Sequence, residues 1–233
     1  MRLYEDILSD AADFGIDVIF HGCTLPRGWE RMYPNHVGSE AVFASENLIF
    51  EQIFCDMEAF HATLHPFIRN SVAMMEYGGT FFNHRMGRDN NSGSIRRTGD
   101  GFQIATAVLF QNPVQNFAIT PNNLTDAPAD AIAFMKDVPT TWEDTKLIEG
   151  YPGKYVVLAR RNGDKWYIAG VNAQKDVMKL KLDLSSLGVE PGSAVILADE
   201  KGKELKSKTL KVKNVKSVPV EILPDGGFVM IIE

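Results

Sequence analysis

The sequence predicts an α/β fold followed by an all-β fold. In residues 1–140, strand-like apolar runs alternate with segments of helical periodicity, whereas residues 141–233 consist of short alternating runs separated by turn residues. The charge also changes: the first part has nine basic and seventeen acidic residues, and the second has fifteen and thirteen. We therefore predict two domains, 1–140 and 141–233, with a boundary within 137–145 around Pro139 and Trp142.

The first part begins with a predicted amphipathic helix. Apolar residues recur at helical spacing from Leu3 to Phe14, and Gly15 ends the pattern. The apolar run Ile16–Phe20 that follows is typical of a buried parallel strand. Further helices are expected over Asn47–Met57, Gly101–Gln111 and Ala127–Met135, and further strands over Asn70–Met75 and Asn116–Ile119.

Strands that alternate with helices indicate parallel β/α units, and in such folds the carboxyl ends of the strands carry the functional site. His21 directly follows the first predicted strand, and a long loop runs from there to about Ser45. Residues 83–99 are predicted to form an exposed loop. About three units are visible, which is too few to close an eight-stranded barrel.

The second part is predicted to be an antiparallel β-sandwich. Tyr155–Arg161 and Lys165–Val171 flank an Asn-Gly pair, which favours a tight hairpin because both residues tolerate positive φ. Further short strands are expected over Met178–Leu184, Ala194–Ala198, Thr209–Val212, Val218–Leu223 and Phe228–Ile232. Seven strands of this length are typical of a sandwich.

Composition excludes several classes of partner. The net charge of −6 argues against nucleic acid, which needs clustered positive charge. No apolar run approaches the ~18 residues of a membrane span, and the acidic, amphipathic first fifteen residues are not a signal peptide. Cys23 and Cys55 either pair in an oxidising compartment or are free core thiols.

The segment 20–46 holds the candidate site. It contains the carboxylates Glu40 and Glu46, together with His21, Arg27 and Arg31, and these residue types suit sugar hydroxyls. A glycosidase needs one carboxyl group as general acid and a second as nucleophile or base. The alternatives are a solvated acidic pair and a structural histidine. No Gly-rich phosphate loop, HExxH pair or CxxC pair is present.

Four stretches together resemble glycoside hydrolase family 97, the α-glycosidases of the Bacteroides type. They are TLPRGWERMYPN, SEAVFASE, HPFIRNSVAMMEYGGTF and VPTTWEDTKLIEGYPGKYVVLARRNGDKWYIAGVNA. The resemblance implies the later part of a (β/α)8 TIM barrel followed by a C-terminal antiparallel β-sandwich. It also implies hydrolysis of α-glycosides with a calcium ion near the catalytic groups.

The resemblance assigns roles to individual residues. Glu46 matches the general acid, or acid/base, and is also a metal ligand, while Glu40 matches a calcium-ligating glutamate. His21, Arg27 and Arg31 are expected to bind substrate. Inverting members of the family carry a Glu where this chain has Gly22, which places the chain with the retaining members.

The retaining members use an Asp nucleophile from an earlier barrel strand, and the matching residue is expected before Met1. Glu76 stands where the family usually has Asp, and with Tyr77 and His84 it forms a second, looser cluster. We therefore expect the C-terminal part of a retaining α-glycoside hydrolase similar to α-galactosidases and α-glucosidases. It would act on oligosaccharides with the missing N-terminal part and be inactive as an isolated fragment.

We expect the full-length enzyme to be periplasmic or extracellular. The alternative from another class is a non-catalytic carbohydrate-binding or scaffolding module.

Overall fold

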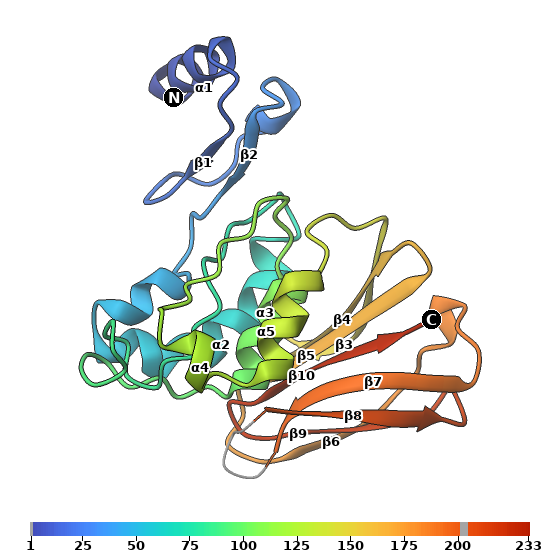
Figure 1. Ribbon diagram of the computed structural model, residues 1–233. Helices are drawn as coiled ribbons and strands as arrows, with labels where there is room; N and C mark the ends of the chain where they lie inside the picture. The colour runs from blue at the N-terminus through green and yellow to red at the C-terminus, as the bar shows by residue number, and fades with distance from the viewer. Residues whose placement is uncertain (1, 201–204) are drawn as a thin grey trace.

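The computed structural model of the chain describes residues 2–200 and 205–233. A small N-terminal arm projects from a larger body of helices and sheets, as Figure 1 shows. The arm contains α1 (Arg2–Asp13), β1 (Val18–Phe20), the 3-10 helix η1 (Trp29–Arg31) and β2 (His36–Ser39). The body contains all the remaining elements.

The arm is held together by one parallel strand pair and an aromatic cluster. β1 pairs with β2 in parallel, and Ile19 lies opposite Gly38. The cluster packs α1, β1 and η1 together, because the Tyr4 ring stacks on Trp29 at 4.7 Å and meets Phe20 edge-on at 4.8 Å. β2 lies inside the segment that the sequence predicted to be loop, so that expectation was wrong there.

Helices form the first layer of the body. They are the 3-10 helix η2 (Ser45–Ile49), α2 (Gln52–Ile68), α3 (Asp100–Leu109), α4 (Asn123–Asp126) and α5 (Ala129–Asp137). The strands predicted at 70–75 and 116–119 are absent from the described residues. Met75 N–H donates to Gln111 and Glu76 N–H donates to Ser39. These two isolated hydrogen bonds go to different neighbouring segments, so they do not form the continuous ladder of a β-sheet.

The second part of the chain is built of antiparallel strands. Its described residues form β3 (Asp144–Tyr151), β4 (Tyr155–Asn162), β5 (Lys165–Asn172), β6 (Met178–Leu182), β7 (Gly192–Asp199), β8 (Leu205–Val212), β9 (Val218–Ile222) and β10 (Gly227–Ile232). Six of them form one sheet in the order β3-β4-β5-β10-β7-β8, and β6 pairs with β9 in a second sheet. The 3-10 helix η3 (Ser185–Leu187) follows β6.

The central strands of the six-stranded sheet, β4, β5 and β10, are buried on both faces. Along β10, Phe228 and Met230 pack toward the β6-β9 sheet, whereas Val229 packs toward the helices. The predicted sandwich is therefore present but unequal, with two strands on one face and helices on the other (Figure 1). Because α3 is buried along its whole length on this sheet, one hydrophobic core extends across residue 140.

Asp199 joins the helices to the sheet. It ends β7, and its carboxylate accepts the N–H groups of Gly101 at 2.7 Å, Phe102 at 3.1 Å and Gly227 at 2.8 Å. Two of these donors are in the first turn of α3, so a strand residue caps a helix that lies about a hundred positions earlier. Burial raises the pKa of Asp199 to about 6, although the backbone N–H groups oppose the shift.

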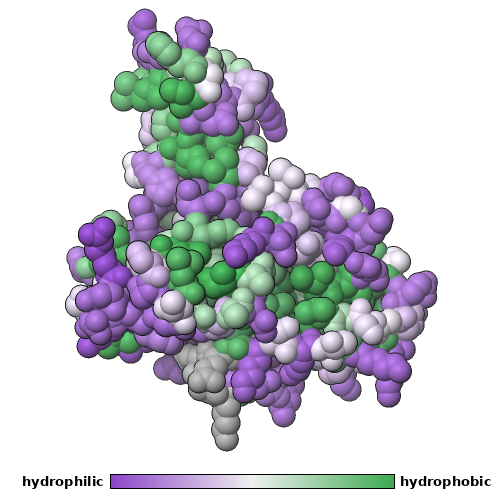
Figure 2. All heavy atoms as spheres, viewed as in Figure 1, coloured by the Kyte–Doolittle hydropathy of each residue, from purple (hydrophilic) through white to green (hydrophobic). Residues whose placement is uncertain are grey.

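Two sequence-based expectations concern membrane-spanning segments and the two cysteines. None of the described helices has the length and apolar character that crossing a membrane requires. Cys23 and Cys55 are both free thiols, and Cys55 is buried. Figure 2 shows apolar side chains on the surface of the arm as well as over the body, and apolar residues of α1 are exposed, including Leu3 and Ile7.

Candidate functional site

The site lies where the two parallel strands of the arm end. His21 directly follows β1 and Glu40 directly follows β2, so both side chains leave the same edge of the pair. The next residues, Gly22 and Ala41, both have positive φ, at 55° and 52°. The strained turn at Ala41, a non-glycine residue, is typical of functional sites. The Gly22 N–H donates to Glu40 Oε2 at 3.1 Å and ties the two strand ends together.

Glu46 reaches the site from the start of η2. The preceding residue, Ser45, is buried, and its N–H donates to the carbonyl of Tyr77 at 2.8 Å. Its hydroxyl lies 3.0 Å from the carbonyl oxygens of Tyr77 and Gly79. Ser45 therefore fixes the start of η2 on the segment 76–79 and places the adjacent Glu46 over the strand ends.

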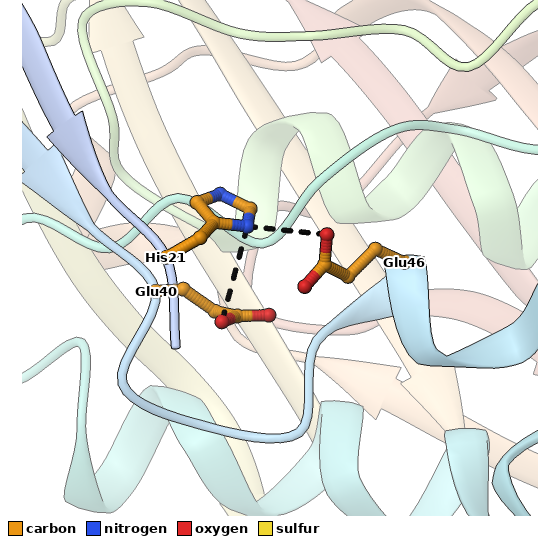
Figure 3. Close-up of side chains that lie close together, drawn as sticks. All are labelled: His21, Glu40 and Glu46. Atoms are coloured by element: carbon orange, nitrogen blue, oxygen red, sulfur yellow. Dashed lines mark ion pairs between the residues drawn. The ribbon is translucent and has the colours of Figure 1, made fainter. Parts of the chain in front are cut away.

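Three carboxylates surround the imidazole of His21. Its Nδ1 lies 3.3 Å from Glu46 Oε2 and 3.8 Å from Glu40 Oε2, as Figure 3 shows. On the other side of the ring, Nε2 lies 2.6 Å from Glu76 Oε2. Glu40 and Glu76 are almost fully buried, while the side chains of His21 and Glu46 are 35% and 42% exposed. The cluster is thus open to solvent on one side.

The electrostatics of the cluster favour positive charge. Burial lowers the pKa of His21, but the charges of Glu76 and Glu40, together with hydrogen bonds to Glu76 and Glu46, outweigh this, so the pKa is raised. Burial raises the pKa of Glu40; the Gly22 N–H opposes the shift, while the nearby Glu46 adds to it. If all three carboxylates are ionised, the cluster is net negative even when the imidazole is protonated.

A divalent cation would fit the cluster. One donor atom from each of His21, Glu40 and Glu46 lies within 4.8 Å of the others. Glu40 Oε1 is buried and has no hydrogen-bond partner in the described part of the chain, which leaves a charged acceptor unsatisfied. Carboxylate oxygens suit calcium, whereas an imidazole nitrogen suits transition metals.

The structure does not bring the other predicted site residues into this cluster. Arg27 and Arg31 are exposed, and no hydrogen bond or ion pair joins either to the carboxylates within residues 2–200 and 205–233. Tyr77 is buried and stacks on Phe110 at 4.0 Å. In the second, looser cluster that the sequence predicted, Glu76 is the residue that reaches the site.

Two residues that support the site were not among the predicted site residues. Glu76 follows an apolar run, as His21 does, and that shared pattern was the available signal. Arg69 is buried and donates to the carbonyls of Ser39 at 2.7 Å and Met74 at 3.2 Å, which holds the end of β2. No sequence pattern indicated Arg69, because its role depends on contacts thirty residues away.

Known proteins resemble this chain over nearly its whole length. Residues 141–233 match the family model described as Glycosyl-hydrolase 97 C-terminal, oligomerisation. The chain is 31% identical over 99% of its length to a probable retaining alpha-galactosidase of Streptomyces bingchenggensis, and 28% identical over 94% to the retaining alpha-galactosidase of Bacteroides thetaiotaomicron. It spans about a third of the length of these relatives, 34% of each.

Solved structures agree in fold. A crystal structure of beta-arabinopyranosidase is 61% identical with a TM-score of 0.94, and the match covers 99% of this chain and 36% of that one. A glycoside hydrolase family 97 enzyme from Pseudoalteromonas sp. strain K8 in complex with acarbose shares the fold, with a TM-score of 0.76 at 21% identity. That match covers 98% of this chain and 36% of the enzyme.

The fold and these relatives show that the chain resembles the C-terminal part of a glycosidase. The resemblance to glycoside hydrolase family 97 is confirmed: residues 141–233 match the C-terminal model of that family, and nearly the whole chain shares the fold of a family 97 enzyme.

Proposed function

We propose that this chain is the C-terminal part of a retaining α-glycoside hydrolase and that Glu46 is its general acid and base. The observation that carries the proposal is the convergence of Glu46, Glu40 and His21 at the ends of two adjacent parallel strands. The similarity to retaining alpha-galactosidases supports the retaining mechanism, as does Gly22, which has no side chain to act as a base.

In this mechanism Glu46 acts twice. Its side chain is 42% exposed, so it can reach a bound sugar, protonate the leaving oxygen and later deprotonate water. The second carboxyl group, the nucleophile, would come from outside this chain and lie about 5–5.5 Å from Glu46, as retention requires. We propose that β1 and β2 belong to the later part of a (β/α)8 barrel that the remainder of the enzyme completes.

Glu40 and Glu46 are the proposed calcium ligands. Two glutamates supply at most four of the six to eight oxygens that calcium takes, so other groups or water complete the shell. A bound calcium ion would supply positive charge beside the sugar oxygens. The unsatisfied Glu40 Oε1 supports this assignment.

We propose an α-galactoside or a closely related oligosaccharide as substrate, with His21, Arg27 and Arg31 as sugar contacts. The similarity to both alpha-galactosidases and a beta-arabinopyranosidase supports this class. An L-configured β-arabinopyranoside has the ring configuration of an α-galactoside without the hydroxymethyl group, so one site can accept both rings.

Two measurements test the proposal. The purified chain should not hydrolyse aryl α-galactosides, because the proposed nucleophile would come from outside this chain, and turnover that Glu46→Gln abolishes would contradict this. Calcium titrated calorimetrically should bind in the millimolar range typical of loosely built sites, and Glu40→Gln should remove the binding. Binding that Glu40→Gln leaves unchanged would show that the cation lies elsewhere.

A further inference from the structure

Glu76 makes the shortest contact in the cluster but has no role in the proposed chemistry. Its carboxylate is 2% exposed, and its Oε2 lies 2.6 Å from His21 Nε2. Its Oε1 accepts the Gly78 N–H at 2.9 Å and the Asn116 side-chain N–H at 3.4 Å. The backbone N–H of Glu76 donates to Ser39 at 3.2 Å. Glu76 is therefore held by contacts to both of its carboxylate oxygens and by a hydrogen bond from its backbone N–H.

This arrangement fixes the imidazole of His21. An ionised carboxylate only accepts hydrogen bonds, so the hydrogen on this contact belongs to Nε2. The ring then turns Nδ1 toward Glu46 and Glu40, at 3.3 and 3.8 Å. Without a cation, Nδ1 can carry a second hydrogen and donate it to a carboxylate; with a cation bound, Nδ1 has lost that hydrogen and offers its lone pair to the cation. Both arrangements need the same ring orientation.

We propose that Glu76 is the positioning residue of the cluster: by holding His21 through Nε2, it places Nδ1 against Glu40 and Glu46 and thereby sets the affinity of these carboxylates for a divalent cation. The cation part of this inference rests on the proposed function. The geometry matches the general pattern in which a carboxylate orients a histidine at a metal site. Loss of such an outer partner weakens metal binding on the order of 10-fold or more.

Histidine ring signals give a direct test. The chain has five histidines, so ¹⁵N-histidine labelling with a His21→Gln variant assigns the ring nitrogens of His21. In Glu76→Gln we expect the Nε2 signal of His21 to move and its downfield ring proton to be lost. Glu58→Gln is the matched control, because Glu58 is also a buried carboxylate but accepts from Thr98 and Gln103 instead.

Calcium titration distinguishes the effect of the His21 ring position from the effect of the Glu76 charge. Glu76→Gln should weaken calcium binding on the order of 10-fold, and Glu58→Gln should leave it unchanged. Glu76→Asp keeps the charge but is one methylene shorter, so it cannot hold Nε2 at 2.6 Å from the same backbone position and should weaken binding as well. Circular dichroism melting curves confirm that each variant is folded.

Two results would overturn the inference: unchanged His21 ring signals in Glu76→Gln, or wild-type calcium affinity in Glu76→Asp. If the wild-type chain binds no calcium, the proposed cation site fails. The ring signals then still decide whether Glu76 positions His21.

Discussion

Replacement of Asp199 by Ala should destabilise the whole body of the protein. The change leaves the N–H groups of Gly101 and Phe102 without their cap, which costs up to about 2 kcal/mol. It also leaves the Gly227 N–H buried without a partner, at about 1–3 kcal/mol. Together we expect a loss of about 3 kcal/mol, a large fraction of the ~5–15 kcal/mol that holds a typical domain folded.

Urea unfolding at pH 7, followed by tryptophan fluorescence and far-ultraviolet circular dichroism, measures this loss. Because Asp199 joins α3 to the sheet, both signals should shift together. Asp183→Ala is the control: Asp183 is an exposed carboxylate that accepts from Ser185, so its removal should cost about 1 kcal/mol or less. A loss below about 1 kcal/mol for Asp199→Ala would refute the reasoning.

Three further predictions concern the same junction. The raised pKa of Asp199, about 6, means that its carboxylate binds a proton more tightly in the folded state than in the unfolded state. The free energy of unfolding should therefore rise by about 1 kcal/mol as the pH falls from 7 to 5, and Asp199→Ala should lose this pH dependence. Gly101→Ala should lower the melting temperature, since its Cβ would lie 2.5 Å from the Gly227 carbonyl oxygen, whereas Gly192→Ala, with no atom closer than 3.8 Å, should not. Trypsin should cut within residues 83–99, and the resistant fragment should retain α3. A resistant fragment that starts after Trp142 would contradict the hydrophobic core that α3 shares with the six-stranded sheet.

Local patterns predicted the elements that have strong periodicity of their own. The helix over residues 3–14 and the hairpin of β4 and β5 are confirmed, because amphipathic spacing and an Asn-Gly turn determine them locally. β2, His36–Ser39, has no apolar alternation and forms because β1 offers a parallel partner. The apolar run 70–75 was predicted to be a strand, but its neighbours supply no continuous ladder.

The candidate site was predictable only in part. His21 could be placed from the rule that strand ends carry sites, whereas Glu40 and Glu46 were singled out as a carboxylate pair in a predicted loop; the structure brings the three residues together. Glu76 was assigned to a second, looser cluster, because the contact that brings it into the site joins it to a residue fifty-five positions away. Arg27 and Arg31 are exposed in this chain, and their proposed contact with substrate stays a prediction.

The central claim is that Glu46 acts as acid and base in a retaining glycosidase. The direct measurement joins this chain to the part of beta-arabinopyranosidase that it does not match, and follows the first-formed anomer by proton NMR during hydrolysis of an aryl glycoside. We predict a product of retained configuration and, for Glu46→Gln, a fall in rate on the order of 100-fold or more. An inverted product, or a Glu46→Gln chimera as active as its parent, would contradict the account.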